Sequence, residues 1–206
     1  MQPFETLDAI AAPYYFPDVD TDKLIPHRFL RKPLAAGYRN FLFYNERFSP
    51  SGELKPDFVL HRSPYDKAQI LVSGPNFGCG STREGAVYAL ADFGIRAVIA
   101  PSFGDIFEAN CLQNGLLPVA LPEDVVKALS QTVEKHPGTT LAIDLREQTV
   151  RAPDGKVHRF EIDPVRKDQL LRGLDDIGIT LQEQRLIESF EASYRSQMPW
   201  LGRRQA

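Results

Sequence analysis

Short apolar runs alternate with helical patterns between residues 69 and 135, and this alternation restricts the folds open to the chain. The expected strands are 69–72, 97–100 and 116–121, and the expected helices are 81–93, 103–112 and 122–135. Strands that alternate with helices pair in parallel, through right-handed crossovers. The pattern therefore predicts an α/β fold with a mostly parallel central sheet flanked by helices, and ligands beyond the carboxyl ends of its strands.

The regions on either side of this core are patterned differently. The first third is rich in proline, tyrosine and phenylalanine and is expected to be irregular. After residue 135, strand-like segments with a turn predict a C-terminal β-hairpin region, followed by helices. The expected strands are 140–145, 149–152 and 156–162, and the expected helices are 164–171 and 181–194. No long polar linker interrupts the pattern, so we expect one domain over residues 1–198 and a flexible tail over 199–206.

The composition excludes several classes of protein. Of the 206 residues, 43% are apolar and 25% are charged, as in an ordinary soluble domain. The net charge of -3, with scattered basic residues, argues against nucleic-acid binding. No apolar run approaches the roughly 20 residues of a transmembrane helix. The N-terminal region carries Glu5 and Asp8 but no lysine or arginine, unlike a secretory or transit signal, so we expect a cytoplasmic protein.

Cys79 and Cys111 are the only cysteines in the sequence. Two cysteines cannot complete a four-cysteine zinc site or supply a whole iron–sulfur cluster. Cys111 lies in an apolar helical pattern and is expected in the core. The glycines beside Cys79 favour a tight turn over a reactive thiol. We therefore expect no metal site on this chain.

A glycine-rich turn at residues 76–84, Asn-Phe-Gly-Cys-Gly-Ser-Thr-Arg-Glu, follows the first expected strand. Glycine allows the backbone to approach a ligand closely, and the free amides of a following helix favour an anion. Arg83 adds a planar set of donors suited to a carboxylate or phosphate. Ser81 and Thr82 add hydroxyl groups at the same position. The turn therefore predicts a carboxylate or oxyanion site.

Other interpretations of this turn are weaker or purely structural. Ser81 followed by Glu84 forms a capping box, which by itself only begins a helix. A dinucleotide fingerprint would need glycine where Arg83 stands, and a P-loop would need a Gly-Lys pair that is missing. The nucleophile elbow G-x-S-x-G fails because Cys79 replaces its first glycine. Helix capping and anion binding both stay open.

Alternating aspartates at residues 18–22, Asp-Val-Asp-Thr-Asp, suggest a calcium loop. Lys23 occupies the glycine position of an EF-hand, and Phe29 occupies its final glutamate position. We reject that interpretation. The aspartates are expected to cap a short helix or to hold a nearby arginine.

Several motifs in order give the chain a resemblance to the small subunits of 3-isopropylmalate dehydratases, the swivelling domain of the aconitase superfamily. The resemblance covers about residues 18–191. Its landmarks are Asp18-Val19-Asp20-Thr21-Asp22, Pro56-Asp57-Phe58-Val59-Leu60, the turn at 76–84, Pro101-Ser102-Phe103-Gly104-Asp105-Ile106-Phe107, Asn114-Gly115-Leu116-Leu117-Pro118 and Gly173-Leu174-Asp175-Asp176-Ile177-Gly178.

The resemblance implies a swivelling β/β/α domain that closes over a separate large subunit. That partner would hold a [4Fe–4S] cluster on three cysteines, with no cofactor on this chain. The implied reaction isomerises 2-isopropylmalate, a dicarboxylic hydroxy acid, to 3-isopropylmalate by dehydration and rehydration in leucine biosynthesis.

The resemblance also assigns roles to residues. Ser81 matches the hydroxyl that serves as the base, Arg83 matches the carboxylate-binding arginine, and Thr82 and Gly80 complete the substrate-binding turn. Residues 29–32, Phe-Leu-Arg-Lys, match the segment that reads the substrate's variable group, which we call the specificity segment. Within it, Arg31 meets either a distal carboxylate or only solvent.

Residues near these positions have less defined roles. Asp22 either holds a site arginine or caps a helix. His27 is interpreted as a surface or packing residue. The remaining histidines, His61, His136 and His158, lie outside every motif and are interpreted as structural.

The sequence departs from the family pattern in places. Gly85 stands where histidine is usual, although glycine in the first helical turn costs up to about 1 kcal/mol. Tyr88 replaces a usual tryptophan, and residues 34–38, Leu-Ala-Ala-Gly-Tyr, lack a usual arginine and two hydroxyls. A dehydratase for another substituted malate, of the methylmalate, dimethylmalate or homoaconitate type, therefore stays open. A non-catalytic carboxylate-binding module is a further alternative.

Overall fold

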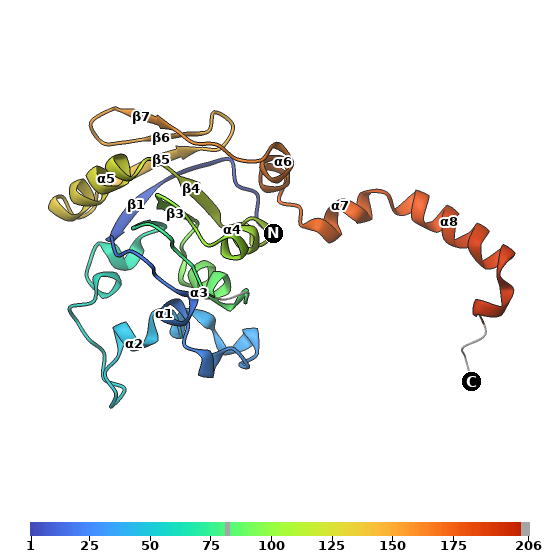
Figure 1. Cartoon of the computed structure of the whole chain (residues 1–206), viewed down its shortest axis with the longest axis horizontal. Coiled ribbons are helices and arrows are strands. Elements are labelled where there is room, and N and C mark those ends of the chain that lie inside the picture. The colour runs from blue at the N-terminus through green and yellow to red at the C-terminus, as the bar shows by residue number, and fades with distance from the viewer. Residues whose placement is uncertain (81–82, 203–206) are drawn as a thin grey trace. The chain divides into compact units, whose positions relative to one another are not determined.

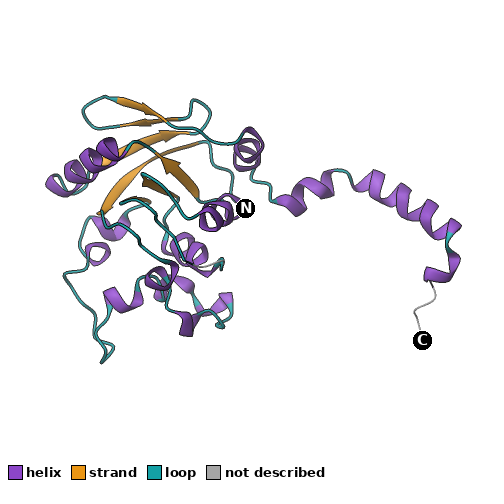
Figure 2. Ribbon diagram, in the orientation of Figure 1, coloured by secondary structure: helices purple, strands orange, loops and turns teal. Residues whose placement is uncertain are grey.

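The computed structural model describes residues 1–80 and 83–202, and its centre is a seven-stranded sheet. The strand order is β4-β3-β2-β1-β5-β6-β7, with the first four parallel and the last three antiparallel (Figure 2). The strands are β1 (Thr6–Tyr14), β2 (Ile70–Ser73), β3 (Ala97–Ala100), β4 (Leu117–Ala120), β5 (Thr140–Asp144), β6 (Thr149–Arg151) and β7 (Val157–Arg159). The predicted α/β fold with a C-terminal hairpin region is confirmed.

Helices cover both faces of this sheet. Figure 1 shows α3 and α4 on one face and α5 on the other, as expected when strands alternate with helices. The helices are α1 (Thr21–Leu24), α2 (Tyr44–Arg47), α3 (Gly85–Phe93), α4 (Asp105–Asn114), α5 (Glu123–Lys135), α6 (Pro164–Arg172), α7 (Asp176–Gln182) and α8 (Gln184–Gln197). The region between α1 and β2 contains α2 and several short 3₁₀ turns, joined by irregular segments.

Strand β1 lies in the first third of the chain, which the sequence predicted to be irregular. Its residues 6–10 pair antiparallel with β5, and its residues 11–14 pair parallel with β2. Pro13, which lacks a backbone N–H, lies beyond the stretch that pairs with β5. A proline is therefore tolerated in this central strand, because no neighbouring strand needs its N–H at that point. In the sequence, the proline argued against a central strand.

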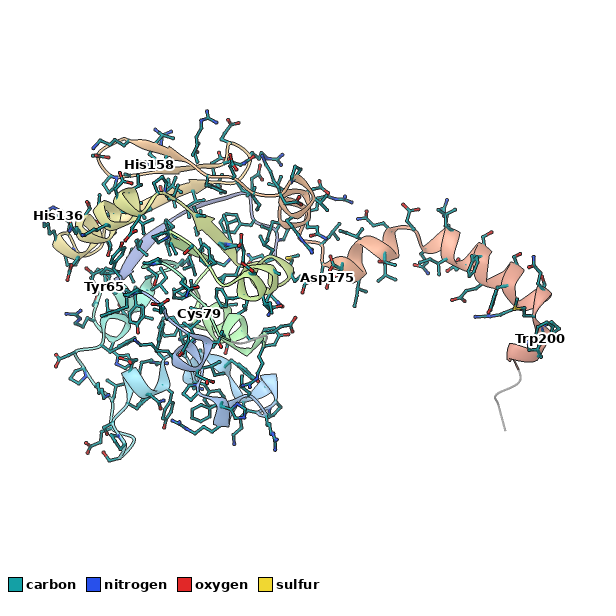
Figure 3. All side chains as sticks on the ribbon, viewed as in Figure 1. Tyr65, Cys79, His136, His158, Asp175 and Trp200 are labelled. Atoms are coloured by element: carbon teal, nitrogen blue, oxygen red, sulfur yellow. The ribbon has the colours of Figure 1, made fainter. Side chains whose placement is uncertain are left out.

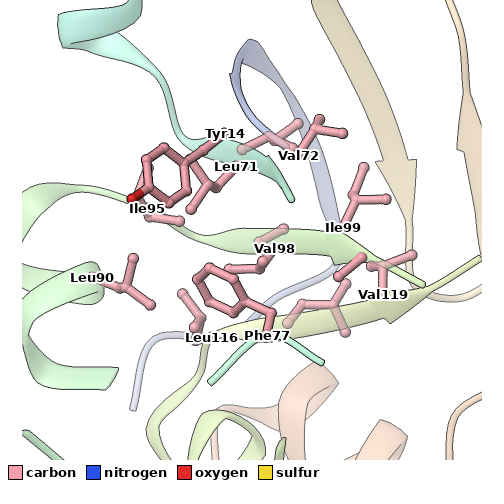
Figure 4. Close-up of a cluster of buried hydrophobic side chains, with 14 of the residues drawn as sticks. Tyr14, Leu71, Val72, Phe77, Leu90, Ile95, Val98, Ile99, Leu116 and Val119 are labelled. Atoms are coloured by element: carbon pink, nitrogen blue, oxygen red, sulfur yellow. The ribbon is translucent and has the colours of Figure 1, made fainter. Parts of the chain in front are cut away.

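The core lies between the sheet and its helices (Figure 4). Every residue of β2 and β3 is buried, as expected for parallel strands covered on both faces. Leu71, Val98 and Ile99 are fully buried there, together with Phe77 from the turn after β2. Each such side chain contributes about 1.5–3 kcal/mol through burial. The end of β2 is thus anchored in the core, close to the glycine-rich turn.

Two predicted helix limits were wrong. The helix expected from residue 81 begins at Gly85, with Glu84 as N-cap and no capping side chain. Glu84 instead accepts a hydrogen bond from the Tyr88 hydroxyl, so its carboxylate is engaged within the helix. The helix expected over residues 181–194 begins at Gln184 as α8, after a break at Glu183 where the backbone leaves helical geometry. The preceding α7 was not predicted.

The chain separates into two compact units, residues 1–173 and 174–206. The first contains the whole sheet and the core. In the second, no described side chain is buried, and several large apolar side chains are exposed on α7, α8 and the turn that follows. They are Ile177, Leu181, Leu186, Phe190, Tyr194 and Trp200. No helix among the described residues is long and apolar enough to cross a membrane.

Replacing Gly78 by alanine should destabilise the first unit. A Cβ there would lie 2.1 Å from Cγ of the buried Phe107, and the backbone has a φ of 77°. We expect a loss of more than about 2 kcal/mol in the free energy of unfolding, measured by denaturant titration. Gly52→Ala is the matched control, because its φ is 85° but nothing lies within 4 Å. It should cost about 1 kcal/mol, and equal losses in the two variants would contradict the packing argument.

A chain that ends at Gly173 should keep the stability of the first unit. All the buried apolar side chains of the described residues lie before that position. We therefore expect the melting temperature of the truncated chain to stay within about 4 °C of the full chain, or about 1 kcal/mol. Calorimetry of both chains measures this, and loss of the cooperative transition on truncation would refute it.

Candidate active site

The glycine-rich turn leaves the carboxyl end of β2 in an unusual backbone conformation. Asn76, Gly78 and Gly80 have φ values of 60°, 77° and 91°. The left-handed region suits glycine, and Asn76 is held there by a 2.7 Å hydrogen bond from its Nδ2 to Asp18 Oδ1. The turn therefore lies where ligands bind in open α/β sheets.

Main-chain hydrogen bonds hold this turn from two sides. On one side, Gly78 N donates to Val19 O at 2.7 Å, and Thr21 N donates to Cys79 O at 3.0 Å. On the other side, Phe77 N donates to Ser102 O, and Gly104 N donates to Phe77 O, both at 3.0 Å. Three sequence motifs, residues 18–22, 76–84 and 101–107, are thereby brought together.

The aspartates of residues 18–22 mainly organise backbone. Asp20 caps α1, because its Oδ1 accepts a 2.6 Å hydrogen bond from Lys23 N. The capping role left open for Asp22 therefore belongs to Asp20. Asp22 is exposed in the first turn of α1 and shares with Arg83 a crevice too narrow to admit water. The crevice is lined by Thr21, Asp22, Ile25, Leu30, Arg83 and Ala86.

Arg83 is hydrogen-bonded to a residue that no motif indicated. Its Nη1 lies 2.7 Å from Nδ1 of His27, which is 56 residues away in the sequence. A guanidinium has only donors, so the imidazole nitrogen must accept, and the ring proton resides on Nε2. The interpretation of His27 as a surface or packing residue missed this contact, since no local pattern connects the two positions.

Of the other predicted site residues in this turn and in the specificity segment, the structure describes Gly80 and Arg31. Ser81 and Thr82 lie outside the described residues. Gly80 immediately precedes them, and a Cβ there would lie 3.7 Å from Asp20 Cβ, an ordinary contact, so its glycine is explained by its φ alone. Arg31 is exposed within the specificity segment.

The structure explains the glycine at position 85. A Cβ there would lie 2.6 Å from Cδ2 of Leu30 and 3.6 Å from Cε1 of Tyr38. Leu30 belongs to the specificity segment, which thus packs directly on the first turn of α3. The buried Tyr38 also donates a 3.0 Å hydrogen bond to Lys32 O at the end of that segment.

Two ionisable groups near the turn are held in their neutral forms. The hydrogen bond to Glu84, aided by burial, raises the pKa of Tyr88 to about 12, so this hydroxyl stays protonated. Burial, followed by the nearby Asp18 and Asp20, raises the pKa of the Cys79 thiol. Cys79 therefore lacks the features of a reactive thiolate, in agreement with its position within a tight turn.

The remaining histidines do not join the turn. Figure 3 shows His136 and His158 on other elements, away from Cys79. His61 accepts a 2.9 Å hydrogen bond from Arg47 Nε and bonds Lys55 O through Nδ1, a structural role. Across residues 1–80 and 83–202, no cluster of three or more histidine, cysteine or acidic side chains could hold a metal ion.

Comparisons with known proteins agree with the motifs. The model of the aconitase C-terminal domain matches residues 1–124, and the LeuD_N model matches residues 127–164. A third model, for the C-terminal domain of the 3-isopropylmalate dehydratase small subunit, matches residues 176–204. Together these matches extend over most of the chain.

Individual relatives lead to the same family. The 3-isopropylmalate dehydratase small subunit of Phenylobacterium zucineum is 52% identical over 202 residues, which is 98% of each chain. That of Afipia carboxidovorans is 49% identical over 201 residues, covering 98% of this chain and all of the relative. The crystal structure of 3-isopropylmalate dehydratase (leuD) from Methanocaldococcus jannaschii is 28% identical, with a TM-score of 0.63 over 90% of this chain and 99% of the other. This chain therefore belongs to the family of 3-isopropylmalate dehydratase small subunits.

Proposed function

We propose that this chain is the small subunit of a hydro-lyase that isomerises 2-isopropylmalate to 3-isopropylmalate in leucine biosynthesis. The observation that carries the proposal is the glycine-rich turn, held by residues 18–22 and 101–104 with Arg83 at its end. Full-length relatives named as 3-isopropylmalate dehydratase small subunits support the substrate.

The chemistry assigned to this chain is proton transfer beside a carboxylate. Ser81 takes the proton from the carbon next to the substrate carboxylate, while hydroxide leaves from the neighbouring carbon. The proton and hydroxide then return with their positions exchanged. Serine is a poor base unless its alkoxide is stabilised, and the cationic Arg83 and the backbone amides of the turn would provide that stabilisation.

Substrate binding is assigned to the same turn and to the specificity segment. Arg83, Thr82 and the backbone of Gly80 bind the carboxylate that flanks the reacting carbons. Arg31 is assigned to the distal end of the substrate, because it is exposed on the segment that packs against α3. Asp22 shares a narrow crevice with Arg83 and is assigned to the surroundings of the site, without contact to the substrate.

The partner is a large subunit that holds a [4Fe–4S] cluster. The match to the aconitase C-terminal domain supports a cluster enzyme, and the small-subunit relatives support a second chain. Such a cluster, when bound to the partner, supplies a Lewis-acidic iron for the departing hydroxyl. The exposed apolar side chains between Ile177 and Trp200 support association with another protein surface. The free thiols of Cys79 and Cys111 favour a reducing compartment, so we place the complex in the cytoplasm.

Removal of the proposed base should abolish turnover without loss of the complex. We expect Ser81→Ala to lower kcat for 2-isopropylmalate at least about 100-fold, the usual scale for general acid–base catalysis. The assay uses the co-expressed complex of both subunits with its cluster reconstituted anaerobically, and follows the unsaturated intermediate by absorbance. Ser51→Ala, an exposed serine in a distant turn, is the control. Full activity of Ser81→Ala would refute this role, and an inactive wild-type complex with a loaded cluster would refute the proposed substrate.

Loss of the charge at Arg83 should weaken substrate binding. A hydrogen bond to a charged group contributes about 1.5–3 kcal/mol, so we expect Arg83→Gln to raise KM about 10- to 100-fold. Steady-state kinetics on the same complex measure this change. The control is Arg151→Gln, an exposed arginine on β6. An unchanged KM in Arg83→Gln would remove Arg83 from the carboxylate site.

A further inference from the structure

The contact between His27 and Arg83 joins two elements that no motif connects. Arg83 lies near the end of the glycine-rich turn, whereas His27 begins a 3₁₀ turn at residues 27–29. The two side chains meet at 2.7 Å, although both are exposed. An exposed arginine side chain has many rotamers, and each hydrogen bond that it makes restricts them. The contact therefore selects one orientation of the Arg83 guanidinium.

The chemistry of this partner suits an arginine that must bind an anion. A carboxylate hydrogen-bonded to Arg83 would neutralise its charge and compete with the substrate. A neutral imidazole accepts one N–H without cancelling the charge. The guanidinium keeps further N–H donors in its plane, enough for a two-point contact with a carboxylate. His27 can thus orient Arg83 while leaving its binding capacity free.

The backbone that carries His27 is itself fixed by packing. Leu30 lies over Gly85, where a Cβ would come within 2.6 Å of its Cδ2. Phe29 stacks on Phe41, with ring centroids 4.4 Å apart. Arg28 Nη2 donates to Asn45 Oδ1 at 2.7 Å. The three residues after His27 are therefore held against α3 and against residues 41–45. This packing places the imidazole beside Arg83.

We infer that His27 is a positioning residue, which holds the guanidinium of Arg83 in the orientation that receives the substrate carboxylate. The packing of Leu30 on Gly85 holds the turn that presents it. The inference rests on the proposed function, because it assigns His27 to substrate binding through Arg83. It also gives a reason for glycine at position 85, since any larger residue there would displace Leu30 and with it His27.

The test is a set of His27 variants in the reconstituted complex of both subunits. One lost hydrogen bond corresponds to a factor of about 2–10, so His27→Ala should raise KM for 2-isopropylmalate by that factor. The kcat should change less than twofold. His27→Asn, which places an acceptor oxygen near the position of Nδ1, should restore KM to within about twofold of the wild type. His27→Asp should raise KM more than alanine does, because its carboxylate competes with the substrate.

A double-mutant cycle separates positioning from a general structural role. In the Arg83→Gln background, His27→Ala should have no further effect on KM, because the group that it orients is gone. His136→Ala, an exposed histidine on another element, is the control and should leave both constants unchanged. Melting temperatures of all variants check that each one folds.

The outcomes distinguish this inference from the proposed function. If the wild-type complex is active and His27→Ala leaves KM unchanged, the inference is overturned but the proposed function is not. The inference is also overturned if His27→Ala changes KM equally with and without Arg83, or if His27→Asn fails to restore KM. A wild-type complex with a loaded cluster but no turnover would overturn the proposed function, and this inference with it.

Discussion

The close packing of Gly78 under the ring of Phe107 is the constraint on which the site depends. With hydrogen as its side chain, Gly78 lets the turn descend onto α4, and its φ of 77° directs the chain back toward residues 18–22. There its N–H reaches Val19 O at 2.7 Å. A side chain at this position would separate the three motifs that the turn joins. The described part of the turn, up to Gly80, is therefore held by backbone contacts.

The acidic side chains near this turn are arranged so that Arg83 stays available to bind an anion. Asp18 and Asp20 are engaged by Asn76 and by the first turn of α1, and Glu84 is engaged by the Tyr88 hydroxyl. The partner found for Arg83 is a neutral ring instead. These three acidic side chains thus have partners other than Arg83, whose charge remains available to an anionic ligand, as a carboxylate-binding site requires.

Most of the sheet could be predicted because its signals are local. Strands β2 and β3 are continuous apolar runs, and the hairpin region has alternating residues and a clear turn. Strand β1 was missed because different halves of it pair with β5 and β2, so neither a simple alternation nor a continuous apolar run describes it. The start of α3 was misplaced because Glu84, read as part of a capping box, bonds Tyr88 instead.

The sequence by itself determined the class of fold, the glycine-rich turn and the residue types suited to a carboxylate, since these depend on neighbours in the chain. Tertiary structure alone decided which residue meets Arg83 and why position 85 is glycine. His27 and Leu30 lie more than fifty residues before their partners Arg83 and Gly85. Contacts of this kind leave no periodic pattern, because they arise only when the packed sheet brings distant segments to one edge.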